Sequence, residues 1–354
     1  MAWIGGTQGG TQGGTQGGTQ GGTQGGTQGG AGEGQTSPLL AAAINLSHDA
    51  TTGYWEPSKT TLQTPKKPTD NVSLQYLSDG RRAQVLLAEL ASVFKVVPIA
   101  PSADEDFTGA SLNIDQTTIA AIHKQEFDVT EQLKFVRGYA DLRHDRLPEI
   151  ITQADDIMPF FRAVAPMNPW EKENTMALLF VVNSLTVLLE MQIKHYCRSP
   201  RPTDFATEVQ PVIPTPDHSS FPSGHATEAM MTATVLHYLR TGDHLLSASP
   251  MPAELCLAHR IAVNRTVAGV HFPVDSAAGA VLGLSIGEAL YSLVKGKTLT
   301  TRTYKCGEIS LNATDDFTLY WLSTKLKNGD GAGKSTATVP LFSRLWEDAC
   351  AEWR

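Results

Sequence analysis

The sequence predicts an all-α fold, a soluble helical bundle that forms one domain, residues 37–354, after a low-complexity tail, residues 1–36. Apolar residues recur at helical spacing in several stretches, as in Ser73–Phe94, and stretches rich in proline and glycine separate them. No series of short alternating segments indicates a sheet. These observations favour helices throughout the domain.

The tail contains six copies of Thr-Gln-Gly-Gly between residues 7 and 30. Because the repeats have neither charge nor apolar periodicity, they cannot bury a core and are typical of a flexible linker. A second interpretation, in which the tail becomes ordered in a homo-oligomer or another tail-mediated assembly, stays open. The N-terminus lacks the basic start and apolar run of a secretory signal, so we expect a cytoplasmic protein, or one exported without a recognisable signal.

Within the domain, the helical stretches follow one another through short connections. We expect the first stretch, Leu39–Leu46, to pack onto the bundle, and Val96–Asp106 to form a proline-containing connection. Pro148 suits the first turn of its helix, and Thr298–Tyr304 alternates weakly, as a short hairpin arm would. The remaining predicted helices are Ser73–Phe94, Ile114–Leu142 as one or two helices, Arg146–Val164, Trp170–Tyr196, Ala226–Leu239, Ala253–Val263, a segment from about Pro273 onward, and Leu341–Glu352.

Two long apolar runs, Met176–Met191 and Ala277–Val294, raise the question of membrane insertion. Polar residues interrupt both runs, whereas a spanning helix needs about 20 predominantly apolar residues. We therefore interpret both as core helices of a soluble protein and expect no transmembrane insertion. Three glycines at intervals of four residues predict that a neighbouring helix packs closely against the second run; they are Gly279, Gly283 and Gly287.

The overall charge excludes some classes of partner. The chain has 36 acidic and 28 basic residues, a formal charge of −8, which argues against a nucleic-acid-binding surface. The four cysteines show no Cys-x-x-Cys spacing, so no zinc site is indicated. Against this acidic background a local basic cluster stands out, made of Lys194, Arg198, Arg201 and Arg265.

Three short stretches between residues 194 and 275 contain the residues that we expect to perform the chemistry. The first is Lys194-x6-Arg201-Pro, the second is Phe-Pro-Ser223-Gly-His225, and the third is Asn-Arg265-x5-His-x3-Asp. Two guanidinium groups match the oxygens of an anion in pairs, and the helix that follows Ser223 offers unpaired backbone N–H groups. Together these groups suit a tetrahedral oxyanion.

The imidazole and carboxylate groups of the same stretches suggest roles in a reaction. His271 is placed to attack or ligate the central atom of the anion, and His225 to pass a proton to or from a leaving oxygen. Asp275 lies four residues after His271, on the same face of a helix, and can accept a hydrogen bond that fixes the tautomer of the ring. Gly224 allows an anion to approach the backbone closely.

These stretches resemble the three-part signature of the type 2 phosphatidic acid phosphatase and vanadium-dependent haloperoxidase superfamily. The resemblance implies a helical bundle around an anion pocket, with His271 as the phosphate-attacking nucleophile or the vanadium ligand, and His225 as the acid–base group. It also implies a set of side chains that bind phosphate or vanadate, namely Lys194, Arg201, Ser223, Gly224 and Arg265. One departure is Asn264, where many phosphatases have serine.

Three functions are compatible with this inventory. We favour a vanadate-dependent haloperoxidase that uses hydrogen peroxide to oxidise bromide or iodide to hypohalous acid, which halogenates a small organic acceptor. In this interpretation vanadate is the cofactor, phosphate can occupy the same pocket, and His218 is similar in place to a histidine of bromide-active relatives. The first alternative is an acid phosphatase with a phosphohistidine intermediate, which the compact spacing from Arg201 to Ser223 favours. The second alternative is a non-catalytic assembly protein that retains the pocket.

Overall fold

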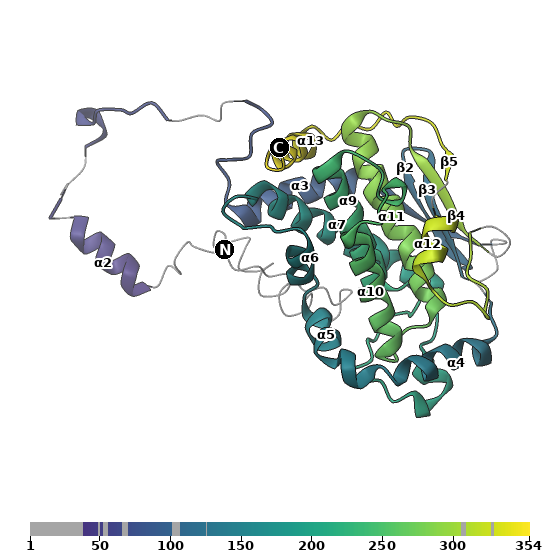
Figure 1. The fold of residues 1–354 in the computed structure, drawn as a ribbon. Helices are drawn as coiled ribbons and strands as arrows, with labels where there is room; N and C mark the ends of the chain where they lie inside the picture. The colour runs from purple at the N-terminus through teal and green to yellow at the C-terminus, as the bar shows by residue number, and fades with distance from the viewer. Residues whose placement is uncertain are drawn as a thin grey trace.

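The computed structural model describes residues 38–48, 50–51, 56–65, 70–100, 107–124, 126–305, 309–326 and 329–354. The tail of residues 1–36 lies outside these ranges, so both interpretations of the repeats stay open. Helices form the body of the protein, and a sheet lies along one side of it (Figure 1). The longer helices are α2 (Pro38–His48), α3 (Asp79–Val93), α4 (Val129–Ala140), α5 (Arg143–Asp155), α6 (Met158–Val164), α7 (Glu173–Cys197), α9 (Gly224–Thr241), α10 (Ala253–Val267), α11 (Pro273–Lys295), α12 (Leu319–Lys325) and α13 (Pro340–Ala351).

The sheet has five strands and makes the prediction of an all-α fold wrong. The strands lie in the order of the chain, antiparallel except for the parallel pair β3 and β4. One face of the sheet packs against α7 and α11. The strands are β1 (Phe94–Ile99), β2 (Gly109–Ile114), β3 (Thr117–His123), β4 (Thr300–Tyr304) and β5 (Asp330–Gly331).

Local features of the strands explain why the sequence pattern concealed them. Pro98 interrupts the apolar run of β1, but β1 is an edge strand, where a missing N–H costs no ladder hydrogen bond. The turn between β2 and β3 has only two residues, and the first, Asp115, has the left-handed φ of 54° that tight hairpin turns require. The stretch Ile114–Leu142, predicted as one or two helices, therefore contains β3 before α4.

Two further helix predictions need correction. The helix predicted at Leu39–Leu46 is present as α2, but every residue of α2 is exposed, so it does not pack onto the bundle. The helix predicted at Arg146–Val164 is divided into α5 and α6. The backbone is extended at Asp156, whose side-chain oxygen accepts a hydrogen bond from the backbone N–H of Met158 and so starts a new helix.

The centre of the core is the pair of helices α9 and α11, which are buried over nearly their whole length. The predicted close approach at the glycines of α11 is confirmed. A Cβ atom at Gly279 would lie 2.5 Å from the carbonyl oxygen of Ser223, and one at Gly283 would lie 2.2 Å from that of Thr227. The close packing positions the N-terminus of α9 beside the N-terminal half of α11.

The expectation of a soluble protein without transmembrane insertion is also corrected. Two helical segments are long and apolar enough to span a membrane, Glu173–Phe205 and Pro273–Lys295, although 56% and 89% of their most apolar windows are buried inside the protein. The polar residues of the first segment lower its apolar character less than we assumed. Ser184 and Thr186 donate their hydroxyl groups to carbonyl oxygens one turn earlier, at 2.8 Å each, so their polar groups are satisfied within the helix.

Candidate oxyanion site

The fold brings the three predicted stretches together. Lys194 lies in the last turn of α7, Arg201 precedes the short helix α8 (Pro202–Phe205), and the second stretch starts α9. Arg265 lies in the last turn of α10, and the third stretch ends where α11 begins. Their charges act on one another: nearby Arg201 and Lys194 add to the effect of burial and hold the pKa of His271 well below its usual value. These residues therefore form one site.

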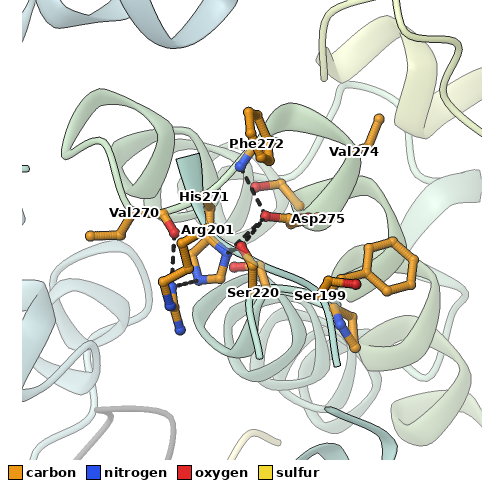
Figure 2. A network of polar contacts seen from close by, with 12 residues as sticks. Ser199, Arg201, Ser220, Val270, His271, Phe272, Val274 and Asp275 are labelled. Carbon is orange, nitrogen blue, oxygen red and sulfur yellow. Dashed lines mark hydrogen bonds and ion pairs between the residues drawn. The ribbon is translucent and has the colours of Figure 1, made fainter. Parts of the chain in front are cut away.

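Arg201 joins the loop before α9 to the start of α11 (Figure 2). Its Nη1 donates to the carbonyl oxygen of Val270 at 2.8 Å, and its Nη2 donates to that of His218 at 3.1 Å. The same Nη1 lies 3.4 Å from Nε2 of His271. Burial lowers the pKa of Arg201 to about 10, so it remains a cation at neutral pH.

His271 is held at its other ring nitrogen by Asp275 and Ser220 (Figure 2). Nδ1 of His271 lies 3.1 Å from Oδ2 of Asp275 and 3.2 Å from Oγ of Ser220, while Ser220 donates to Oδ2 at 2.5 Å. Because Arg201 can only donate, the arrangement assigns the proton of a neutral His271 ring to Nδ1 and a lone pair to Nε2. The contact that we predicted between Asp275 and the ring is present, and the lone pair of Nε2 faces Arg201 at the long distance of 3.4 Å.

The carboxyl group of Asp275 is subject to opposing effects. Burial raises its pKa to about 6, whereas hydrogen bonds from Ser220 and from the backbone N–H of Phe272 oppose this rise. The Phe272 N–H donates to the same Oδ2 at 2.9 Å. Ser220 therefore helps to keep Asp275 ionised and able to hold the proton on Nδ1 of His271.

Arg265 and Ser223 present donors that have no partner. Both side chains are buried, and Nε and Nη1 of Arg265 and Oγ of Ser223 lack a hydrogen bond within the described residues. Only Nη2 of Arg265 is engaged, by the carbonyl oxygen of Ile150 at 3.0 Å and by Oε1 of Gln153 at 3.4 Å. Buried donors without acceptors are costly, so this side of the site is complementary to an anion.

His225 stands beside Arg265 at the start of α9. Its Nε2 lies 3.0 Å from the carbonyl oxygen of Gln153. Burial and the charge of Arg265 hold the pKa of His225 well below its usual value, so the ring is neutral at neutral pH. A carbonyl oxygen only accepts, which assigns the ring proton to Nε2.

A buried carboxylate that the motifs did not reveal, that of Glu190, lies near Lys194 and Gly224. Lys194 donates through Nζ to the carbonyl oxygen of Pro222 at 2.6 Å. Glu190, one turn earlier on α7, is fully buried, and burial raises its pKa while it lowers that of Lys194. Its Oε1 would lie 2.7 Å from a Cβ atom at position 224, which is a reason for glycine there that sequence reasoning missed.

A cavity of 610 Å³ opens beside the site, and its lining includes Lys194, Arg201 and His218. Nδ1 of His218 lies 3.3 Å from Nη2 of Arg201, so the imidazole borders the anion-binding side chains. Arg198, part of the basic cluster that we predicted, also lines the cavity but is exposed and donates to the carbonyl oxygen of His195. The cavity therefore borders the site on the side of Lys194 and Arg201.

Sequence reasoning missed several contributors to the site for different reasons. Ser220 lies only three residues before Ser223, and its position in the same loop was a usable signal. Glu190 shares the face of α7 with Lys194, four residues away, and was interpreted only as a polar interruption of an apolar run. Ile150 gives no signal because it contributes only a backbone carbonyl oxygen, and Gln153, which contributes both its carbonyl oxygen and its side-chain Oε1, lies in α5, far from the motifs.

Comparisons with known proteins bear on these predictions. Residues 174–299 match the sequence model of the PAP2 superfamily. Over 118 residues the chain is 32% identical to the decaprenylphosphoryl-5-phosphoribose phosphatase of Mycobacterium tuberculosis, in strains CDC 1551 and H37Rv. This alignment covers 33% of the chain, and the chain spans 58% of the length of these curated relatives.

A solved structure, that of the first transmembrane PAP2 type phosphatidylglycerolphosphate phosphatase from Bacillus subtilis, is similar with a TM-score of 0.26 and 22% sequence identity. It covers 46% of this chain and 94% of that chain. The curated relatives are named as phosphatases, so they favour the alternative prediction of a phosphatase and do not support the haloperoxidase with its peroxide, halide and organic acceptor. The halide-placing role of His218 stays a prediction. The similarity to the PAP2 superfamily is therefore carried by residues 174–299, the part of the chain that contains the three stretches.

Proposed function

We propose that this protein is a phosphatase that hydrolyses phosphate monoesters through a phosphohistidine intermediate on His271. One observation supports the proposal above the others: the donors of Arg265 and Ser223 are buried without acceptors, beside a neutral histidine whose Nε2 carries a lone pair. A phosphate group supplies the missing acceptors and brings its phosphorus atom to that nitrogen.

The reaction begins when the phosphate dianion binds between Arg201 and Arg265. Nε2 of His271 attacks phosphorus, the bond from phosphorus to the leaving oxygen breaks, and the electron pair stays on that oxygen. Asp275 stabilises the positive charge that develops on the His271 ring through the hydrogen bond at Nδ1. In the second step water attacks the phosphorus atom of the phosphohistidine, the bond from phosphorus to Nε2 breaks, and inorganic phosphate is released.

His225 carries the proton in both steps. It is neutral at neutral pH, and the negative charge of a bound phosphate favours its protonated form. Protonated His225 donates to the leaving alcohol oxygen, and the neutral ring then accepts a proton from the attacking water. The carbonyl oxygen of Gln153 keeps the ring in place during this exchange.

The name of the curated relatives indicates a phosphate ester of a lipid-linked sugar as their substrate. For this chain we extend only the general class, a phosphate monoester. We also propose that vanadate binds the same donors as a mimic of phosphate, in which case it inhibits the reaction. Its role as a resident cofactor stays a prediction.

Hydrolysis of p-nitrophenyl phosphate by the full chain tests the proposal, with and without orthovanadate. We expect release of p-nitrophenol that His271→Ala abolishes and orthovanadate inhibits. Trapping the acid-labile phosphate on His271 with a labelled substrate tests the intermediate. Failure to hydrolyse either p-nitrophenyl phosphate or a panel of lipid and sugar phosphates, in a chain that binds phosphate, would overturn the proposal.

A further inference from the structure

Helix α5 lies outside the part of the chain that matches the PAP2 superfamily, yet it forms one wall of the site. It is attached to α10 by polar contacts rather than by apolar packing alone. Glu149 accepts from Arg260 at 2.7 and 2.9 Å and from Nδ2 of Asn264 at 2.9 Å. Nη1 of Arg146 donates to Oδ1 of Asn264 at 3.2 Å. The position of α5 is therefore fixed relative to the end of α10 that bears Arg265.

Gln153, in the last turn of α5, contacts two groups of the site at once. It is fully buried. Its side-chain Oε1 accepts from Nδ2 of Asn264 at 2.9 Å and from Nη2 of Arg265 at 3.4 Å. Its backbone carbonyl oxygen lies 3.0 Å from Nε2 of His225. One residue thus connects the anion-binding side chain with the acid–base side chain.

We propose that Gln153 is a positioning residue of the oxyanion site. Its side-chain oxygen orients the guanidinium of Arg265, and its backbone carbonyl oxygen orients the ring of His225. The anion-binding part of this inference stands on the contacts of Arg265 alone, and only the His225 part rests on the proposed function. Nothing in the superfamily motif specifies a residue at this position.

The geometry explains why one additional acceptor matters for Arg265. Two acceptors at Nη2, from Ile150 and Gln153, define the rotation of the guanidinium plane, whereas one acceptor leaves the plane free to turn about that bond. The defined plane points Nε and Nη1, the two nitrogens without partners, in a fixed direction. A bidentate contact with phosphate needs that direction, so the loss of Oε1 weakens anion binding without removing any charge.

Asn264 in turn holds Gln153 in its orientation. Its Nδ2 donates to Oε1 of Gln153 and to Oε2 of Glu149, so the side chain that Arg265 contacts is itself fixed. The departure from serine at this position therefore has a structural role, since a serine side chain is too short to bridge Glu149 and Gln153. The chain of contacts runs from Glu149 through Asn264 and Gln153 to Arg265.

The test compares phosphate binding by Gln153→Met, which keeps the length of the side chain but removes the acceptor, with the native chain. Isothermal titration with inorganic phosphate should show about a tenfold weaker Kd, the size expected for one hydrogen bond to a charged group. The matched control is Arg260→Met, which breaks an ion pair between α5 and α10 but touches neither Arg265 nor His225. Its phosphate Kd should stay within about twofold of native, because partly exposed ion pairs contribute little.

A double-mutant cycle separates positioning from general destabilisation. If Gln153 acts through Arg265, Gln153→Met causes no further loss of phosphate affinity in an Arg265→Ala background. An equal loss in both backgrounds, or a native Kd in the single variant, overturns the inference. If Gln153→Met does not fold, Asn264→Ser is titrated in its place and cycled against Arg265→Ala in the same way.

The backbone contact is tested without a substitution at Gln153. Nitrogen-15 NMR of the histidines in the native chain should show His225 as the Nε2–H tautomer, and an Nδ1–H tautomer contradicts this part of the inference. This measurement tests the orientation of the His225 ring, whereas the acid–base role of that ring rests on the proposed function. A chain that binds phosphate through Gln153 and Arg265 but hydrolyses no phosphate ester disproves the phosphatase and leaves the positioning role intact. If Gln153→Met keeps full phosphatase activity and native phosphate affinity, the positioning role is disproved and the proposed phosphatase function stands.

Discussion

The two sides of the oxyanion site differ in how completely their donors are satisfied. On the side of α11, Arg201, His271 and Asp275 form a continuous network, and Arg201 has backbone acceptors in two separate loops. On the side of α10, Arg265 and Ser223 bury donors that have no acceptor within the described residues. The first side, which we call the satisfied side, is rigid before a ligand arrives. The second, which we call the open side, is completed only by the ligand. Nucleophile orientation and anion affinity are therefore separable properties of this site.

The largest expected effect comes from the satisfied side. His271→Ala should lower turnover of p-nitrophenyl phosphate by about a thousandfold or more. The variant lacks the nucleophile, so no phosphohistidine forms for water to hydrolyse. Phosphate affinity, measured by titration, should change only a few-fold. A variant that keeps substantial turnover would assign the nucleophile to another residue and remove the basis of the comparison.

On the open side, Arg265→Met should weaken phosphate binding by about 10- to 150-fold, the range expected when a charge-assisted contact of 1.5–3 kcal/mol is lost. The Tm should fall less than in Arg201→Met, because the loss of the Nη2 donor to Ile150 and Gln153 is offset by the removal of two buried nitrogens that lack acceptors within the described residues. Calorimetry measures both quantities on the same sample. A fall in Tm as large as that of Arg201→Met would show that Nε and Nη1 of Arg265 have partners in solution other than the ligand.

Arg201→Met should show the opposite balance between binding and stability. Its removal leaves the carbonyl oxygens of Val270, His218 and Pro216 without their donor, so we expect the Tm to fall by about 2 °C or more. Phosphate affinity should also fall, but the drop in Tm is what distinguishes this variant from Arg265→Met. Equal Tm values in the two variants would contradict the difference between the two sides.

Ser220→Ala should change the pH dependence of activity more than its maximum. Burial raises the pKa of Asp275 to about 6, and the hydrogen bond from Ser220 opposes the rise, so its loss raises this pKa further. Asp275 must be ionised to hold the proton on Nδ1 of His271. The acid limb of the pH–activity profile should therefore lie at a higher pH in the variant than in the native chain. Turnover should drop several-fold near about pH 6 and approach the native value near about pH 8.

The hydroxyl-retaining variant Ser220→Thr serves as the control for this pH profile. It keeps a donor for Asp275 and should keep the acid limb of the native chain. If Ser220→Ala and the native chain have the same acid limb, Ser220 does not influence the ionisation of Asp275.

The satisfied side of the site was predictable from sequence because its residues recur at short, fixed spacings and belong to charged or titratable types. Arg201, His271 and Asp275 are charged or titratable residues at fixed distances along the chain, and the structure brings them into contact. The spacing does not reveal which reaction they serve, since phosphate and vanadate need the same donors. The choice of haloperoxidase depended on residues such as His218, whereas the curated relatives are named as phosphatases.

The remainder of the fold depends on pairings between residues that are distant in sequence. β3 and β4 pair residues that lie more than 180 positions apart, as Ala120 and Arg302 do, and neither strand has an apolar pattern strong enough to identify it alone. α5 reaches the site through two backbone carbonyl oxygens, which every residue has, and through the side chain of Gln153, which lies more than 40 residues before the first motif. In the sequence, the contact between α5 and α10 was indicated only by Asn264 itself, which departs from the serine of many phosphatases.

The smallest expected effect concerns that departure, and it tests whether the open side depends on α5. Asn264→Ser installs the residue that many phosphatases have and removes the bridge between Glu149 and Gln153. Arg265 keeps its contact with Ile150, so we expect phosphate affinity to weaken only about two- to fivefold, with a small fall in Tm, as for one neutral hydrogen bond. The control is Asn312→Ser, the same substitution at an exposed site whose side chain contacts only Asp315 among the described residues. If Asn264→Ser binds phosphate as tightly as this control, α5 does not set the orientation of Arg265, and the open side is organised by α9 and α10 alone.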